Sequence, residues 1–167
     1  MSSKVNQISC DLIIIGTGMA GMAAALFAAR QGLDAVQVGI TGELGFASGP
    51  LDLLGVHPVA EGRILEDPWQ GIAALGRDEP LHPFAKLELG VIRQAMNAFL
   101  DFLKTGGYPH TTLGQRNMTL ITAAGTRKPT YAVPHTMQHG PAALARQVSC
   151  LLVGFEGLKG FSARQIA

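Results

Sequence analysis

Residues 10–40, CDLIIIGTGMAGMAAALFAARQGLDAVQVGI, decide the fold of this chain because two different periodicities meet within them. The β-branched, continuously apolar run at residues 10–15 is typical of a strand that is buried in a parallel sheet. The Ala-rich stretch at residues 18–31 contains no proline and predicts a helix that ends at Gly32. A second apolar run at residues 35–40 then completes a strand–helix–strand unit.

The turn between the first strand and the helix is rich in glycine. Glycines at this place let the backbone approach a pyrophosphate, and the helix N-terminus behind them offers free N–H groups and a positive dipole end. The turn therefore predicts a dinucleotide or flavin site. The alternative is that the glycines only close the helix against the strand. The residues expected to hold the cofactor phosphate are Gly16, Thr17, Gly18, Met19, Ala20 and Gly21.

The acidic residue that usually ends the second strand and holds a ribose hydroxyl is missing from this sequence. Spacing from Gly32 places that position near Gly39, and Glu43 is the only nearby carboxylate. This departure counts against tight NAD binding and leaves the contact with the adenosine ribose open.

Composition narrows the class of protein. The chain has 167 residues, of which 47% are hydrophobic and 15% charged, and this suits one α/β domain. Its net charge of +1 and the lack of a basic run give no reason to expect nucleic acid as a partner.

Residues 12–29 are uncharged and long enough to consider as a membrane span, but the glycines and the strand-to-helix switch favour a buried unit. Cys10, Cys150 and the histidines show no ligand spacing, so we expect buried, reduced thiols and no metal site.

Two helices are expected after the strand–helix–strand unit. Asp67 as cap and Pro68 at the first helical position predict a helix that ends near Gly76. A second helix is predicted within residues 83–105, from apolar residues at helical spacing and a Gly pair beyond them. The stripe expected to lie in its core face is Ile92, Met96, Phe99, Phe102 and Leu103.

The expected fold class is α/β, a Rossmann-like FAD/NAD(P)-binding fold with a parallel sheet and a β excursion, truncated at the C-terminus. We expect one flavin- or dinucleotide-binding region over residues 1–167. Its expected parts are a βαβ unit (8–42), a loop with helices (43–107), a β excursion (108–140) and a strand that returns to the parallel sheet (146–157). Because a compact domain rarely ends just after such a strand, the chain looks like the N-terminal part of something longer.

Three further stretches carry a family resemblance. They are FASGPLDLLG (46–55), YPHTTLGQRNMTLITAAGTRKPTYAVPHTM (108–137) and LLVGFEGLKGFSARQIA (151–167). Placed in this order after GTGMAG, they resemble the B-subunit of the anaerobic glycerol-3-phosphate dehydrogenases, over nearly the whole chain.

The resemblance implies a flavin-dependent complex of three different subunits at the inner face of the bacterial cytoplasmic membrane. Such a complex oxidises sn-glycerol 3-phosphate to dihydroxyacetone phosphate and passes electrons to quinone in anaerobic respiration. The B-subunit in that family is a flavoprotein described as using FMN, with FAD as the alternative here, while sister subunits carry FAD and iron–sulfur clusters. Membrane association would come through a partner and not through a spanning helix.

The resemblance also adds candidate residues outside the glycine turn. Ser48 and Gly49 lie where similar flavoproteins bring a loop against the flavin, although an ordinary turn is the alternative. Asp52 is expected to be a helix cap or a polar contact. Arg127 and Lys128 lie in AAGTRKP, the expected loop between two short strands, where they are candidates to bind the phosphate of a substrate or a partner.

The chemistry itself is not assigned. His135 is a weak candidate acid or base near neutral pH, and no residue is a persuasive catalytic base. Two further hypotheses therefore stay open: an assembly or electron-relay subunit with a degenerate flavin fold, and, less favoured, a generic NAD(P)-binding reductase. A truncated flavin fold also exposes an apolar edge, so we expect a homo-oligomer, burial by a partner, or poor solubility of this chain alone.

Overall fold

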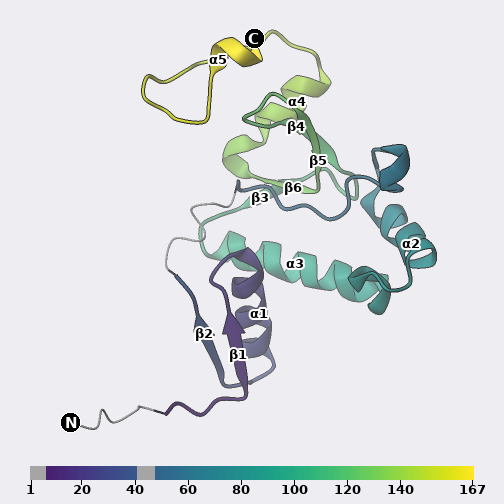
Figure 1. Ribbon diagram of the computed structural model, residues 1–167, viewed down its shortest axis with the longest axis vertical. Coiled ribbons are helices and arrows are strands. Elements are labelled where there is room, and N and C mark those ends of the chain that lie inside the picture. Colours follow the sequence, from purple (N-terminus) through teal and green to yellow (C-terminus); the bar gives the residue numbers. More distant parts are fainter. Residues whose placement is uncertain (1–6, 41–47) are drawn as a thin grey trace. The chain divides into compact units, whose positions relative to one another are not determined.

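The computed structural model describes residues 7–40 and 48–167 (Figure 1). The chain divides into two compact units, Met1–Ser48 and Gly49–Ala167, and a single cofactor-binding region over both stays a prediction. Glu43, the nearest carboxylate to the ribose position, lies outside the described residues.

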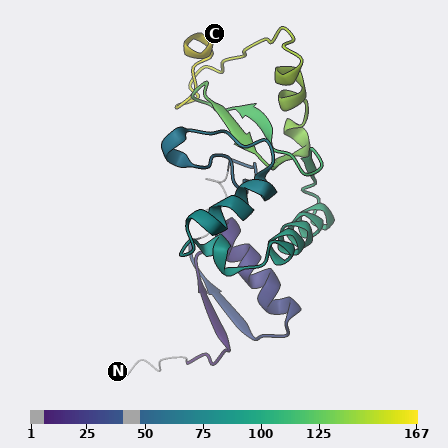
Figure 2. The ribbon, with the colours of Figure 1, turned by 90° about the vertical axis from the view of Figure 1, so that its right-hand side faces the viewer.

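The first unit is the expected strand–helix–strand unit. It contains β1 (Leu12–Ile15), α1 (Met19–Arg30) and β2 (Ala35–Val38). The strands are parallel, with register from Leu12↔Ala35 to Ile15↔Val38, which confirms the parallel sheet. Figure 2 shows α1 along one side of the two strands, where Ile14 and Ala28 are buried.

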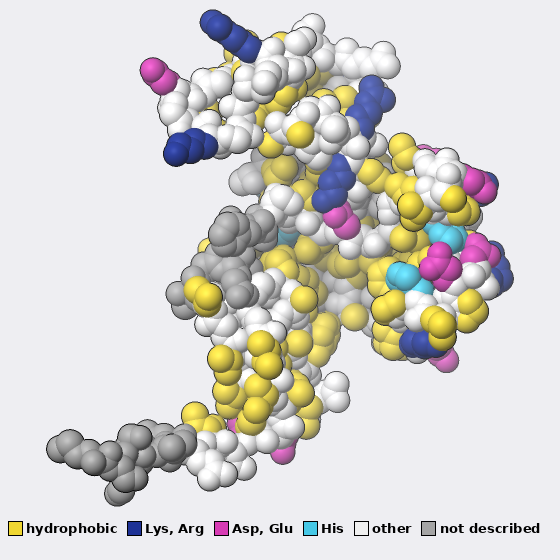
Figure 3. All heavy atoms as spheres, in the orientation of Figure 1, with side chains coloured by type: hydrophobic (Ala, Val, Ile, Leu, Met, Phe, Trp, Pro, Cys, Tyr) yellow, Lys and Arg dark blue, Asp and Glu magenta, His cyan; other side chains and the backbone are white. Residues whose placement is uncertain are grey.

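The opposite face of this two-stranded sheet is apolar and exposed. Side chains alternate between the faces of a strand, so Ile13 and Ile15 share the face that Ile14 does not use. Ile13 is 63% exposed, Ile15 is 89% exposed and Val38, the partner of Ile15, is 54% exposed. Figure 3 shows hydrophobic side chains gathered on the surface of this unit. A sheet of this kind is normally covered on both faces, so this face needs a cover.

The second unit combines helices with two antiparallel strand pairs. Its helices are α2 (Pro68–Asp78), α3 (Leu89–Thr105), α4 (His139–Ala145) and α5 (Ala163–Ile166), with short 3₁₀ turns η2 (Val59–Glu61), η3 (Pro83–Lys86) and η4 (His135–Met137). Its strands are β3 (His110–Thr112), β4 (Met118–Ile121), β5 (Arg127–Thr130) and β6 (Ala132–Pro134). Pairing is β3 with β6 and β4 with β5.

The core of the second unit forms where α2 and α3 meet β6. Trp69 packs edge-on against Tyr131 with ring centroids 5.4 Å apart, and the Arg93 guanidinium lies 4.3 Å from the centre of the Trp69 ring. Leu51 bridges to Ala132 and so brings the segment after Gly49 onto the same core.

The two expected helices form, with differences at their ends. Asp67 Oδ1 accepts hydrogen bonds from the N–H groups of Trp69 (2.9 Å) and Gln70 (3.1 Å), and Pro68 takes the first helical position, which confirms the expected start. The helix continues to Asp78, past Gly76. The stretch expected as one helix over residues 83–105 is broken by extended backbone at residues 87–88 into η3 and α3.

The core face of α3 is narrower than the sequence indicated. Ile92, Phe99 and Leu103 are buried, and Met96 packs against the core. Phe102 is 38% exposed, so its placement in the core was wrong. Phe102 stacks on the buried Phe99, with ring centroids 6.3 Å apart.

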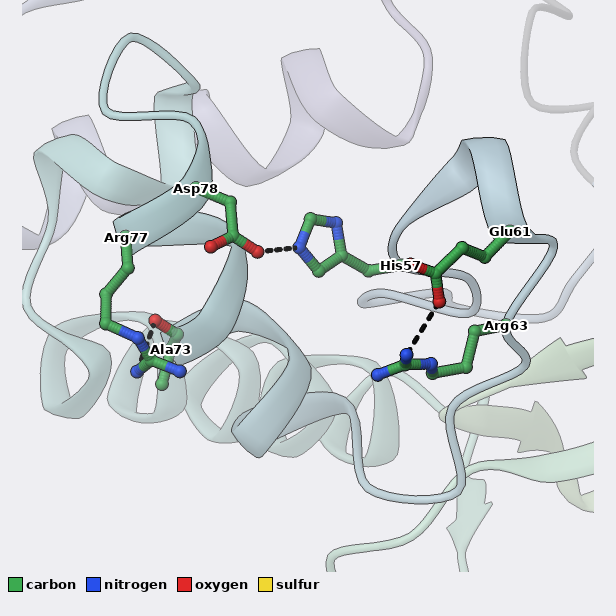
Figure 4. Close-up of polar contacts among 6 residues, drawn as sticks. All are labelled: His57, Glu61, Arg63, Ala73, Arg77 and Asp78. Atoms are coloured by element: carbon green, nitrogen blue, oxygen red, sulfur yellow. Dashed lines mark hydrogen bonds and ion pairs between the residues drawn. The ribbon is translucent and has the colours of Figure 1, made fainter.

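A buried histidine ties the segment before α2 to the end of that helix (Figure 4). His57 is buried, and its Nε2 lies 2.8 Å from Asp78 Oδ2. Nearby, Arg63 pairs with Glu61 at 2.6 Å, and the Arg77 side chain donates to the Ala73 carbonyl at 3.1 Å. The first contact joins two segments that are distant in sequence, and the other two are local.

Three further expectations are corrected by the structure. The loop between β4 and β5 is shorter than AAGTRKP, because the chain reverses at residues 122–126 with Gly125 at φ +78°, and Arg127 already lies in β5. The strand expected at 146–157 is not formed: no described strand pairs with these residues, and Leu151 is 88% exposed. Cys150 is exposed and Cys10 half-buried, so the thiols are not both buried as expected.

Among the described residues, no helix has the length and apolar character needed to cross a membrane.

The exposed sheet face leads to a prediction about association. We expect the 167-residue chain alone to elute from size-exclusion chromatography above its monomer mass, because the face formed by Ile13, Ile15 and Val38 is exposed. Ile15→Thr should shift the elution towards the monomer. Ile64→Thr, a matched change at an exposed residue of the second unit, should not. A monodisperse monomer of the unchanged chain would contradict the expectation.

Candidate functional site

The glycine turn is held against β2 by hydrogen bonds on both sides of Gly16. The Gly16 N–H donates to the Val38 carbonyl at 2.7 Å, and Gln37 Nε2 donates to the Gly16 carbonyl at 2.8 Å. Gly16 has φ +119°, a backbone conformation that side chains disfavour. The turn is thus fixed by β2, and its first position requires glycine.

Gly21 is required by packing. A Cβ built on Gly21 would collide with the Gly16 carbonyl oxygen and would lie 2.9 Å from Gln37 Nε2. The absence of a side chain lets α1 approach the turn closely. Gly16 and Gly21 therefore have a structural reason to be glycine. This agrees with the alternative that the glycines close the helix against the strand, and a turn packed in this way can still bind a phosphate.

Among the residues that the structure describes, no side chain caps the N-terminus of α1, which leaves it suited to an anion. Gly18 is the N-cap residue, with φ −73° and ψ −176°, and it makes no side-chain cap hydrogen bond; the first turn contains no acidic residue. The first N–H that bonds back within the helix is that of Met22, to the Gly18 carbonyl at 3.0 Å. The N–H groups at the start of a helix lack intrahelical acceptors, so those of residues 19–21 are suited to a pyrophosphate. These features fit a flavin or dinucleotide phosphate.

The ribose position at the end of β2 is closed. A Cβ on Gly39 would lie 2.8 Å from Thr17 Cγ2 and 3.0 Å from Thr17 N. Thr17 is held there because its Oγ1 donates to the Ile40 carbonyl at 2.7 Å. A carboxylate side chain at position 39 would therefore displace the turn, which gives a physical reason for the missing acidic residue. Neither this contact nor the role of Gln37 was apparent from the sequence.

Ser48 and Gly49 fall on either side of the boundary between the units. Ser48 is exposed. Gly49 has φ +92°, and a Cβ atom at this position would lie only 2.8 Å from Pro134 Cγ, so there is no room for a side chain. His110 Nε2 lies 3.0 Å from the Gly49 carbonyl, and its Nδ1 lies 3.0 Å from the Tyr108 carbonyl. Contact of Ser48 and Gly49 with flavin stays a prediction, and His110 is a residue near the loop that the sequence did not single out.

Arg127 and Lys128 do not come together. They are consecutive in β5, so their side chains point to opposite faces of the strand. Lys128 Nζ forms an ion pair with Asp52 Oδ2 at 2.6 Å, and Asp52 caps no helix in the described residues. The two side chains therefore do not bind one phosphate together in this geometry. A phosphate-binding role for either one stays a prediction.

The side chain of His135 lies beside uncharged polar side chains. Its Nδ1 is 3.4 Å from Thr111 Oγ1, and its Nε2 is 3.0 Å from Gln138 Nε2, while Thr111 Oγ1 donates to Gln138 Oε1 at 3.1 Å. These partners orient the ring but do not assign it an acid or base role. In the part of the chain that the structure describes, no group of three or more His, Cys, Asp or Glu residues could hold a metal ion.

Comparison with known proteins points to flavin binding. A family model described as FAD binding domain matches residues 11–167. Proteins named as the B-subunit of anaerobic glycerol-3-phosphate dehydrogenase are similar: that of Vibrio vulnificus is 31% identical over 93% of this chain, and that of Yersinia pseudotuberculosis is 30% identical over 94%. A Halobacterium salinarum protein, named as the probable equivalent, is 35% identical over 96%. The resemblance found in the sequence is thereby confirmed.

The chain spans only about a third of these relatives: 35% of the Vibrio vulnificus protein, 36% of the Halobacterium salinarum protein and 37% of the Yersinia pseudotuberculosis protein. No solved structure matches the chain.

The packing of Gly21 gives a test of the turn. Gly21→Ala should destabilise the first unit by about 1–3 kcal/mol and lower its flavin content, because the added Cβ displaces the Gly16 carbonyl. Urea unfolding and the flavin absorbance of the purified protein measure the two effects. Gly90→Ala is the matched control, since its Cβ meets open space in α3 and should leave both unchanged or raise stability slightly. Equal behaviour of the two variants would refute the packing argument.

The contacts of His110 predict a second effect on stability. His110→Phe removes the polar contacts to the carbonyls of Gly49 and Tyr108, and should lower the free energy of unfolding by about 1 kcal/mol. His139→Phe, at an exposed histidine in α4, should change it by less than about 0.5 kcal/mol. Indistinguishable urea midpoints for the two variants would show that His110 does not hold this loop.

Proposed function

The chain belongs to the FAD binding domain family, and from that premise we propose that it is part of a flavoprotein subunit of a quinone-linked dehydrogenase that oxidises sn-glycerol 3-phosphate to dihydroxyacetone phosphate. The proposal is supported most directly by the uncapped N-terminus of α1, which follows a glycine turn that is hydrogen-bonded to β2. The substrate is taken from the relatives, which are named as the B-subunit of anaerobic glycerol-3-phosphate dehydrogenase.

The family match supports FAD as the cofactor, which the sequence analysis placed second to FMN. We propose that the backbone N–H groups of Met19, Ala20 and Gly21 hold its pyrophosphate, and that Gly16, Thr17 and Gly18 shape the turn around it. When bound, the flavin supplies the acceptor for hydride removed from the alcohol carbon. We extend the binding site to Ser48 and Gly49 on the family resemblance, and assign no catalytic base.

The proposed setting follows from the same relatives, whose names designate one subunit of a dehydrogenase. We propose sister subunits that carry FAD and iron–sulfur clusters, and a peripheral position at the cytoplasmic face of the inner membrane that is reached through those partners. The exposed face formed by Ile13, Ile15 and Val38 supports burial by further protein.

An assembly or electron-relay subunit with a degenerate flavin fold is the second candidate. The closed position at Gly39 favours it, because the adenosine ribose then lacks its usual carboxylate partner at the end of β2. The same feature weighs against a generic NAD(P)-binding reductase, which depends on that contact more strongly.

The cofactor is tested by the visible spectrum of the intact protein, purified without added flavin. We expect a bound flavin spectrum and, after heat release and chromatography, FAD at about one per chain. Release of FMN alone would overturn the choice of FAD, and a colourless protein that takes up neither flavin would overturn the flavoprotein proposal.

The choice between catalytic and assembly roles needs a variant. Gly16→Val introduces a side chain at φ +119° and should abolish flavin binding. In the assembled complex, loss of glycerol 3-phosphate oxidation would support a catalytic flavin subunit. Full activity without this flavin would support the assembly role, provided that the variant still assembles.

A further inference from the structure

A cavity of about 1100 Å³ lies in the second unit outside every residue assigned to flavin above. Its walls come from β3, β4, β5 and α4, with α4 packed beside β4 (Figure 1). Its polar and charged lining includes Asn117, Thr119, Arg127, Arg146 and Glu66.

The charge of this cavity is positive. Arg127 and Arg146 both line it, and neither has a carboxylate partner among the described residues. Glu66 is the one carboxylate among the lining residues, and it is paired with Arg116 at 2.9 Å. Two arginines thus line a cavity in which the one carboxylate among the lining residues is already paired, an arrangement that suits an anion.

Two uncharged polar residues, Asn117 and Thr119, also line the cavity. Asn117 is 9% exposed; its Nδ2 donates to the carbonyls of Leu54 and Leu65, both at 2.9 Å, which fixes the orientation of the amide. The buried Oδ1 of Asn117 then has no hydrogen-bond donor in the described structure. The hydroxyl of Thr119 also has no partner among the described residues. Because the Asn117 Oδ1 is buried, the exposed Thr119 hydroxyl is the group in this part of the cavity that suits a ligand with hydroxyl groups.

We propose that this cavity binds a small organic phosphate: Arg127 and Arg146 contact the phosphate monoester, and the Thr119 hydroxyl contacts the hydroxyl-bearing carbon chain. A guanidinium can give a phosphate two parallel hydrogen bonds, which favours a doubly charged monoester over a neutral polyol. The sequence suggested Arg127 and Lys128 as the phosphate ligands. Because Lys128 is paired with Asp52, Arg146 replaces it as the second ligand. The phosphate site stands apart from flavin binding, and only the choice of glycerol 3-phosphate as a probe rests on the proposed function.

The test is isothermal titration of the intact, purified protein with glycerol 3-phosphate, inorganic phosphate and glycerol, under anaerobic conditions without an electron acceptor. We expect both phosphates to bind and glycerol to bind at least tenfold more weakly, since a charge-assisted hydrogen-bond pair is worth about tenfold or more in Kd. Equal binding of glycerol and glycerol 3-phosphate would overturn the proposal.

Variants then assign the site to the two arginines. Arg127→Gln and Arg146→Gln should each raise the Kd for glycerol 3-phosphate about tenfold, while Arg127→Lys keeps the charge and should lose less. Arg164→Gln, a matched change at an exposed arginine outside the cavity, should alter the Kd by less than about twofold. Less than about a twofold effect of both cavity variants would overturn the proposal.

Flavin content measured in the same samples separates the two proposals. Phosphate binding by a chain that holds no flavin would support this site and count against the proposed function. Flavin binding with no phosphate affinity would overturn this site alone.

Discussion

The hydrogen bond from the Gln37 side chain to the Gly16 carbonyl is the contact on which the candidate cofactor site depends. It fixes the turn to β2, and the Gly16 N–H holds the same turn from its other side through Val38. With the carbonyl of Gly16 fixed, α1 can approach only because residue 21 has no side chain. The direction of α1, and therefore of its free N–H groups, follows from this packing.

The second unit is organised around a different set of contacts. The aromatic pair Trp69 and Tyr131 joins α2 to the segment between β5 and β6, and Asn117 ties β4 to the carbonyls of Leu54 and Leu65. These contacts join segments that are distant in sequence, and α4 packs beside β4 in the same unit. The cationic cavity is a product of this arrangement, because Arg127 and Arg146 come from different elements.

Much of the local structure was predictable because it depends on neighbours in sequence. The glycine turn, the parallel strands of the first unit and the cap at Asp67 all follow from short patterns. The failures came where distant segments decide. An apolar run such as residues 148–155 becomes a strand only when another strand pairs with it. The sequence also could not show that Lys128 is paired with Asp52, which lies far from it along the chain. The closed position at Gly39 likewise depends on Thr17, which lies in the turn before α1.

In the proposed cofactor site, the amides at the start of α1 receive the cofactor phosphate. Hydrogen–deuterium exchange of the intact protein, with and without FAD, tests it at the residues concerned. We expect slower exchange at residues 17–22 when FAD is bound, with little change in α2 and α3. Unchanged exchange at residues 17–22 while FAD is bound would show that the phosphate lies elsewhere.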